Sequence, residues 1–336
     1  MRQVNFRKEK RGMKKFLKLE GSQYFKYMDL PLRIVSAGVG KTDEGHHHHD
    51  YTFINHYHSF SEMVLINEGR GVQNINGVDY KVEKGDLFLM DGATTHYFRK
   101  GSCCHIVNIL YEKKNLGLPW ELLRQSRGYN MFFEVEPQGR SIKNFRNHLR
   151  LNEKNLKLFS SYTRNISNQV KIAEEEENVY SKLDALKSFV ELIIFISRLS
   201  EHASESYDSV LPGISRVIAM LETDFGENHT LDTMASAACT SPRNFSRQFS
   251  RVTGETPGNY LLKIRMQNAL KLLRNSDLSI DLIASRCGFS DSCYFSKTFS
   301  RCFGITAREC RKLFKESDER PKLAELKKYS IFPDQR

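Results

Sequence analysis

The chain of 336 residues is 40% apolar, which is enough for about two globular domains with sizeable cores. Lys and Arg outnumber Asp and Glu by 51 to 40, and the excess is concentrated in residues 1–20 and 211–315. The longest apolar run, at 192–196, is far shorter than the roughly 20 residues of a bilayer span, and no secretory signal is readable. Composition therefore favours a globular cytoplasmic protein over a membrane or secreted one.

The cysteines fit neither a disulfide framework nor a zinc ribbon, because their number is odd and no Cys-x-x-Cys pair is present. We therefore expect free thiols and a reducing compartment. The seven positions are Cys103, Cys104, Cys239, Cys287, Cys293, Cys302 and Cys310.

Residues 51–111 have the pattern of short antiparallel strands separated by turns. Alternating apolar runs flank Asn76 and Gly77, a dipeptide that favours a type I′ hairpin turn because both central positions need positive φ. A second turn is predicted at 83–86 and a later strand at 105–111. So many short, regularly spaced strands predict a small β-barrel or a sandwich.

Beyond residue 140 the sequence becomes charged and helix-forming. Apolar residues recur there at three- and four-residue steps, which predicts a helix with one buried face. That face packs either against the barrel or against a second copy of the chain in a dimer, and both readings stay open. The stripe consists of Leu183, Leu186, Val190, Ile193, Ile196 and Leu199.

An internal repeat follows, in which residues 234–257 align with 283–307. Each copy runs from a helix through a Ser-bearing turn into a second helix. In the first copy Pro242 is expected at the first helical position, and in the second copy Gly288 provides the turn and Ser290 is the expected N-cap. This pattern predicts two helix-turn-helix units.

The second helix of each copy has two faces. Aromatic residues spaced by four, such as Phe245 and Phe249 or Phe295 and Phe299, are expected in the core, together with Cys287 and Cys302. The opposite face carries small hydrogen-bonding residues and one long cation, which suits a helix in the major groove. The candidate DNA-binding residues are Arg243, Asn244, Ser246 and Arg247 in the first copy, and Ser292, Cys293, Ser296 and Lys297 in the second.

Residues 257–275 between the copies have an uninterrupted helical pattern of about 28 Å, at 1.5 Å per residue. Because one turn of B-DNA is roughly 34 Å, this spacer would present the two reading helices to successive major grooves. Candidate phosphate contacts are Arg251, Arg301, Lys263, Arg265 and Arg286.

Residues 269–304 resemble the signature of the AraC/XylS family of transcription regulators, with an Ala-Leu-Leu helix, an Ile-Ala pair, Gly-Phe, Tyr-Phe-Ser and Phe-Gly at matching spacings. The resemblance covers about 100 residues and includes Gly-x-x-Pro at 254–257. The chain departs from the family at its end, where Ala307 and Cys310 replace the usual Pro and Tyr. The resemblance implies promoter binding, and usually activation through contacts with RNA polymerase.

The first domain resembles the two cupin motifs. His56, His58, Glu62 and Gly69 match the first motif, and Gly85 with His96 eleven residues later matches the second. If 56–66 is a strand, the first two histidines and Glu62 share one face, which a barrel turns inward.

Three imidazoles and a carboxylate could hold a divalent metal, and an enzyme would follow from that. Two departures from the second motif weaken the metal reading: Asp91 stands where Pro is usual, and Lys100 where Asn is usual. Regulators of the resembled family use this pocket for a small effector, often a sugar. We therefore interpret His56, His58, Glu62 and His96 as effector-binding, and expect no metal, no cofactor and no catalytic residue. The histidine run at 46–49 is interpreted as an exposed loop.

The predicted fold class is a multidomain α+β protein: a cupin-like antiparallel β-barrel, a helical linker and an all-α tandem helix-turn-helix domain. The predicted function is a cytoplasmic, homodimeric, sequence-specific activator that responds to a small molecule. The alternatives are a metal-dependent cupin enzyme with an accessory helical domain, and an architectural DNA binder. Met13 offers an alternative start. The predicted divisions are a basic segment at 1–20, the effector domain at 21–140, the dimerisation linker at 141–210, the DNA-binding domain at 211–316 and a tail at 317–336.

Overall fold

The computed structural model describes residues 17–25, 29–40, 52–92, 94–139, 149–204 and 210–316. Residues 1–16 of the predicted basic segment, the histidine run at 46–49 and the tail at 317–336 lie outside the described residues. The chain forms two compact units. The first consists of Met1–Trp120 and Met131–Tyr207, and the second of Glu121–Asn130 and Asp208–Arg336.

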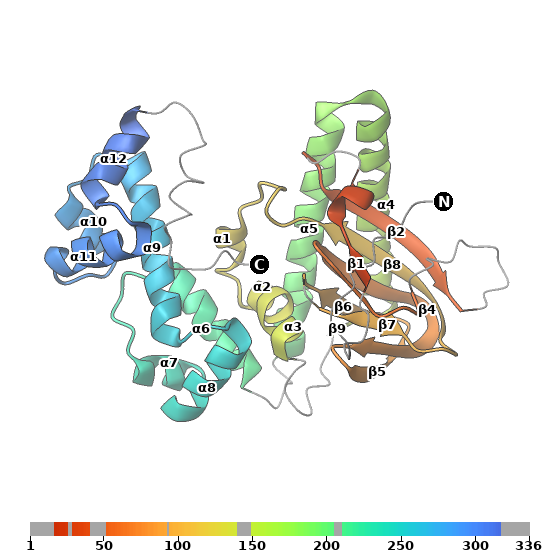
Figure 1. Ribbon diagram of the computed structural model, residues 1–336. Helices are drawn as coiled ribbons and strands as arrows, with labels where there is room; N and C mark the ends of the chain where they lie inside the picture. The colour runs from red at the N-terminus through yellow and green to blue at the C-terminus, as the bar shows by residue number, and fades with distance from the viewer. Residues whose placement is uncertain are drawn as a thin grey trace, which may run out of the picture. The chain divides into compact units, whose positions relative to one another are not determined.

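The first unit is built on a curled sheet that is antiparallel except for one parallel pair, β1 with β3 (Figure 1). A largely antiparallel, cupin-like fold was predicted, and this is confirmed. The strands within the described residues are β1 (Leu17–Leu19), β2 (Leu32–Val39), β3 (His56–His58), β4 (Ser61–Ile75), β5 (Val78–Glu83), β6 (Asp86–Met90), β7 (His96–Phe98), β8 (Cys103–Tyr111) and β9 (Leu149–Arg150).

The long strand β4 is shared by both halves of the sheet. Its first half pairs with β6, its second half pairs with β5 and β7, and β8 runs along its first ten residues. A register shift between Ile66 and Glu68 and a φ of +78° at Gly69 bend the strand between the two halves. The hairpin to β5 turns at Asn76 and Gly77, with φ of 49° and 85°, as type I′ requires.

Short helical segments follow β8, and two long helices then complete the first unit. The helices α4 (Glu153–Glu176) and α5 (Val179–Ser204) pack against each other, α4 also contacts β2, and Phe189 of α5 packs against Tyr111 of β8 with ring centroids 5.1 Å apart. The apolar stripe predicted on α5 is divided, since Ile193 and Ile196 are fully buried whereas Leu183 is 56% exposed. The short segments after β8 are α1 (Trp120–Leu123), α2 (Arg127–Tyr129), η2 (Asn130–Val135) and α3 (Glu136–Gly139), and one more, η1 (Gly21–Gln23), lies between β1 and β2.

The second unit is helical and contains the predicted repeat: α7 and α8 form one helix-turn-helix, α10 and α11 form the other, and α9 lies between them in the chain. No helix among the described residues is long and apolar enough to cross a membrane. The helices are α6 (Leu211–Thr223), α7 (Leu231–Ala237), α8 (Pro242–Thr253), α9 (Pro257–Asn275), α10 (Ile280–Arg286), α11 (Ser292–Phe303) and α12 (Ala307–Glu316).

Local sequence signals explain where these helices begin and end. Pro242 begins α8, as expected, and Ser241 caps this helix, whereas α11 is capped by Asp291, so the prediction of Ser290 was wrong by one residue. The Asp291 carboxylate accepts a hydrogen bond from the Cys293 N–H at 2.8 Å. A carboxylate is stabilised at this position because the helix N-terminus has unpaired N–H groups and a partial positive charge. Gly254 and Gly304 end α8 and α11 with φ of 75° and 71°.

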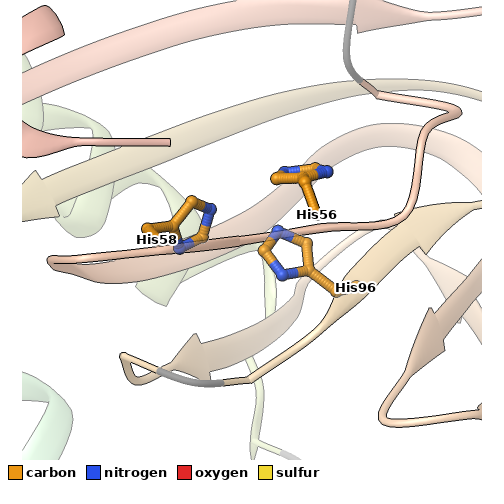
Figure 2. A group of neighbouring side chains, drawn as sticks. All are labelled: His56, His58 and His96. Atoms are coloured by element: carbon orange, nitrogen blue, oxygen red, sulfur yellow. The ribbon is translucent and has the colours of Figure 1, made fainter. Parts of the chain in front are cut away.

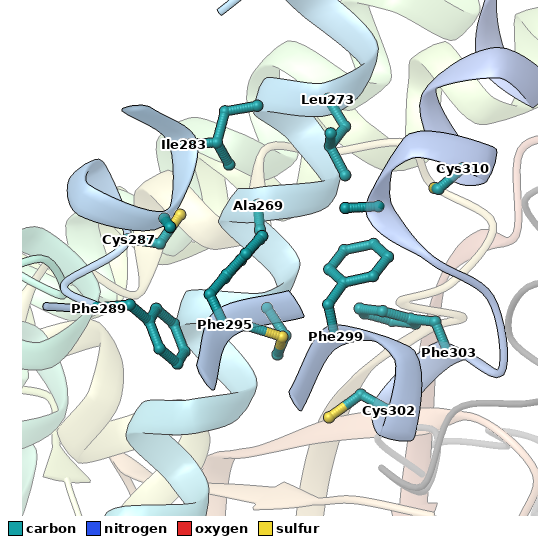
Figure 3. Packing of buried hydrophobic residues seen from close by; sticks show 13 residues of the cluster. Ala269, Leu273, Ile283, Cys287, Phe289, Phe295, Phe299, Cys302, Phe303 and Cys310 are labelled. Carbon is teal, nitrogen blue, oxygen red and sulfur yellow. The ribbon is translucent and has the colours of Figure 1, made fainter. Parts of the chain in front are cut away.

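The core of the second repeat is the aromatic cluster that the four-residue spacing predicted (Figure 3). Phe295 and Phe299 are fully buried, and their ring centroids lie 5.8 Å apart. Cys287 and Cys302 are fully buried in the same cluster, which confirms them as small core residues.

Candidate functional site

The first candidate site is a cavity inside the curled sheet. Its volume is about 50 Å³, which is room for several water molecules, since each needs at least about 10–15 Å³ on this measure. The apolar lining consists of Leu19, Tyr24, Val35, Phe60, Val64, Phe98, Ile106 and Leu110, and the polar lining of Thr52, His56, His58, Glu62, Gln73, His96 and Asn108. All four residues predicted to bind an effector therefore line one cavity.

Strand pairing brings the three histidines together (Figure 2). His56 and His58 project from β3, and His96 from β7, where it pairs directly with His56 in the ladder. The ring centroids of His56 and His96 are 4.3 Å apart, and one nitrogen from each of the three rings lies within 4.8 Å of the others. All three side chains are buried.

Glu62 of β4 faces two of these rings. Its Oε2 atom lies 3.1 Å from Nε2 of His58 and 3.1 Å from Nε2 of His96. Neither contact has hydrogen-bond geometry, and Oε2 has no hydrogen-bond partner among the described residues. The other oxygen, Oε1, accepts a hydrogen bond from the amide of Asn108 on β8.

Burial sets the charge of this cluster. It lowers the pKa of His56 to about 3, with the neighbouring His96 acting in the same direction. Burial also lowers the pKa of His58, against the attraction of Glu62. For Glu62 itself burial raises the pKa, but the interactions with His58 and His96 outweigh it and hold the pKa well below its usual range. At neutral pH a buried carboxylate thus lies among imidazoles, of which His56 and His58 favour the neutral form.

The cavity is also lined by two polar residues that the sequence analysis did not single out, Gln73 and Asn108. Gln73 is fully buried, and neither its Oε1 nor its Nε2 has a hydrogen-bond partner within the described part of the chain. The Oδ1 atom of Asn108 and the Nδ1 atom of His58 are likewise without one there. Because an unpaired buried polar atom costs about 1–3 kcal/mol, a set of them facing one cavity favours a polar occupant.

The second candidate site is the outer face of α8 and α11. Every predicted residue of this face reaches the surface. The cations and Cys293 are exposed: Arg243, Arg247, Arg251, Cys293, Lys297 and Arg301. The smaller polar residues are half-buried: Asn244, Ser246, Ser292 and Ser296.

Asn244 is already engaged within the first repeat. Its amide nitrogen donates to Thr240 Oγ1 at 2.9 Å, and its carbonyl oxygen accepts from the Arg247 guanidinium at 2.9 Å. These bonds orient Arg247 on the exposed face. The sequence missed one neighbour on α11, Tyr294, whose ring is 56% exposed.

Two of the candidate phosphate contacts have partners inside the helical unit. Lys263 is buried and forms an ion pair of 2.7 Å with Glu255, so its charge is neutralised by a partner within the helical unit. The guanidinium of Arg265 donates to the carbonyl oxygens of Phe225 and Glu227, both at 2.8 Å. Arg286, in contrast, is exposed.

Comparison with known proteins matches both units. A cupin domain model matches residues 38–107, and a helix-turn-helix domain model matches residues 234–313. The HTH-type transcriptional activator RhaS of Enterobacter sp. (strain 638) is 29% identical over 259 residues, which cover 77% of this chain and 87% of that protein. RhaS of Klebsiella pneumoniae (strain 342) is 29% identical over 261 residues, with the same shares covered.

One solved structure, an AraC-type transcriptional regulator from Chromobacterium violaceum, is 32% identical over 31% of this chain and 92% of its own, with a TM-score of 0.29. The cupin-like sheet and the tandem helix-turn-helix domain, matched by both domain models and by the activator relatives, define a two-domain, DNA-binding transcription regulator. The chain thus combines an N-terminal cupin domain with an AraC-type helix-turn-helix domain, and the relatives it resembles are transcriptional activators.

Proposed function

We propose that this regulator is an activator whose cavity binds a small, neutral, polyhydroxylated molecule, such as a sugar, and that this binding controls DNA occupancy by α8 and α11. The supporting observation is the unpaired amide of Gln73, which offers a buried donor and acceptor. A sugar hydroxyl can donate and accept, and the apolar faces of a sugar ring suit the aromatic lining provided by Phe60 and Phe98.

The DNA half of the proposal assigns roles to the exposed side chains. Arg247 and Lys297 occupy corresponding places in the two repeats and would reach base edges in the major groove, where Arg pairs well with guanine. Arg243, Arg251 and Arg301 would contact phosphates or bases nearby. Asn244 is a positioning residue for Arg247, because both ends of its amide are engaged.

The oligomeric state and the cellular compartment of the protein are part of the same proposal. We infer a homodimer in the cytoplasm, which binds promoter DNA, contacts RNA polymerase and catalyses no reaction. Exposed apolar side chains at the start of α5, Val179, Tyr180 and Leu183, support a contact between two copies. The relatives named as transcriptional activators support the regulatory role.

The effector assignment is tested by calorimetry. The wild-type chain and a Gln73→Leu variant are each titrated with a panel of neutral monosaccharides. We expect at least one sugar to bind the wild-type chain and to bind Gln73→Leu at least about tenfold more weakly, because the hydroxyls lose their partner. Gln169→Leu, a half-exposed change on α4, is the matched control and should bind like wild type. Equal sugar affinity in Gln73→Leu would refute this role of the cavity.

A further inference from the structure

The long helix α9 packs against both repeats. Near its start, the Tyr260 ring packs edge to face on Phe249 of α8, with ring centroids 5.4 Å apart. Farther along, Ala269 and Leu273 are buried in the core of the second repeat. A single connecting helix sets the distance between two units through its length, whereas their relative rotation depends on every contact that joins them.

A second connection joins the two repeats beside the middle of α9. The loop between α6 and α7 leads directly into the first repeat, and α6 is itself attached to that repeat, because the Arg216 guanidinium donates to the Ala237 carbonyl oxygen at 2.9 Å. From this loop, Phe225 packs against the core of the second repeat. The loop therefore contacts both repeats.

Arg265 of α9 ties this loop to the second repeat. Its Nε and Nη2 atoms donate to the carbonyl oxygens of Phe225 and Glu227, both at 2.8 Å. Its guanidinium carbon lies 5.7 Å from the ring centroid of Phe289, a residue of the second core (Figure 3). One planar cation thus makes two charge-assisted hydrogen bonds to the loop and a cation–π contact to the second repeat. The single ammonium of a lysine could not reproduce this forked contact.

Two glycines allow the loop and the turn of the second repeat to meet backbone to backbone. A Cβ at Gly288 would lie 2.6 Å from the Gly226 carbonyl oxygen and 2.6 Å from Nη2 of Arg265. A Cβ at Gly226 would lie 2.8 Å from the Arg286 carbonyl oxygen. Distances this short leave no room for a side chain on either partner, so the close approach needs glycine on both sides.

We propose that Arg265 is a positioning residue that locks the angle between α8 and α11, and that this joint makes the protein select DNA sites by the spacing of their two recognised segments. The joint consists of 225–227, Arg265 and 286–289. The selection rests on the proposed function, since spacing matters only if both helices contact DNA. A locked angle lets both helices bind without losing freedom, whereas a loose joint reaches other spacings at lower affinity.

Binding to duplexes of altered spacing tests the selection. In a site chosen from random duplexes, two base pairs are inserted between the recognised segments, which turns one segment by about 70° around the duplex relative to the other. The wild-type chain should bind the altered site at least about tenfold more weakly, and Arg265→Ala no more than about threefold. Arg265→Lys should lie between them, because an ammonium keeps the charge without the fork.

Two control variants separate positioning from stability and from charge. Leu273→Ala creates a cavity in the second core and lowers stability, but it leaves the joint and the spacing preference in place. Arg274→Ala removes an exposed charge from α9 and should also leave the spacing preference unchanged. Equal discrimination between the two spacings in wild type and Arg265→Ala would overturn the proposed selection.

A distance measurement without DNA examines the joint by itself. Replacing Cys103 by Ser leaves Cys239 and Cys293 as the exposed thiols of the described chain, one in each repeat, for nitroxide labelling. Labelled chain is diluted in unlabelled chain, so that double electron–electron resonance records distances within one copy. We expect a narrow distribution in the Arg265 background and a clearly broader one in Arg265→Ala.

The two experiments fail in different ways. An unchanged width in Arg265→Ala would contradict the locked joint, whatever the DNA measurements give. Failure of the wild-type chain to bind DNA through both helices would refute the proposed function, and the spacing selection with it, whereas the distance distribution would still decide whether Arg265 holds the two repeats together.

Discussion

The guanidinium of Arg124 donates from Nε to a carboxylate oxygen of Glu222 at 2.9 Å, and both side chains are less than one tenth exposed. Arg124 lies in the segment 121–130, which belongs to the helical unit although the chain on both of its sides belongs to the sheet unit. The carbonyl of Arg124 also accepts a hydrogen bond from Asn130. A buried ion pair therefore helps to hold this segment against α6.

Removing one partner of this pair should destabilise the helical unit. Glu222→Ala leaves the Arg124 charge buried and is expected to cost about 3 kcal/mol. Urea unfolding of the full chain, followed by hydrogen exchange within α6, measures the loss. The matched control is Glu121→Ala in the same segment: its partner is Lys271 and both side chains are more than 40% exposed, so the cost should be below about 1 kcal/mol. Equal costs in the two variants would contradict this reading.

The turn of the first repeat holds a non-glycine residue in a left-handed conformation. Cys239 has a φ of 54°, and the corresponding residue of the second repeat is Gly288, with a φ of 76°. Cys239→Gly should therefore stabilise the protein by roughly 0.5–1 kcal/mol, as judged by thermal unfolding. Gly288→Ala should destabilise it, because a Cβ there would lie 2.6 Å from the Gly226 carbonyl oxygen. A lower melting temperature in Cys239→Gly would count against relief of strain.

Asn244 should act on DNA through Arg247. Arg247→Ala is expected to cost about 1–3 kcal/mol on the preferred site. Asn244→Ala should also weaken binding, but much less when Arg247 is already Ala, since its amide then has no guanidinium to orient. Fluorescence anisotropy on the four proteins of this cycle gives the coupling. Fully additive losses would show that Asn244 contacts DNA independently. Lys187→Ala, an exposed change on α5, is the control.

Local chemistry made much of the fold predictable. The turn at Asn76 and Gly77, the start of α8 at Pro242, and the buried stripe containing Phe295 and Phe299 depend on neighbours within a few residues, so periodicity and turn preference suffice. Contacts made across the chain were not predictable in this way. Lys263 and Arg265 looked like surface cations, but their partners come from other segments.

Gln73 shows how the candidate site was only partly found. Counting by two along β4 from Glu62 places Gln73 on the opposite face of the strand. The register shift between Ile66 and Glu68 reverses that parity, so both side chains line the cavity. Asn108 lies on the inward face of β8 beside Ile106 and Leu110, and only the pairing of β8 with β4 brings it to Glu62.

The claim on which the account chiefly depends is that α8 and α11 read DNA as a pair. Hydroxyl-radical footprinting on sites selected from random duplexes tests it most directly, with the full chain and any bound effector supplied. We predict two protected patches about one helical turn, roughly 34 Å, apart on one side of the duplex, with Arg247→Ala weakening one and Lys297→Ala the other. Protection of a single patch, or equal loss at both patches from either variant, would contradict the account.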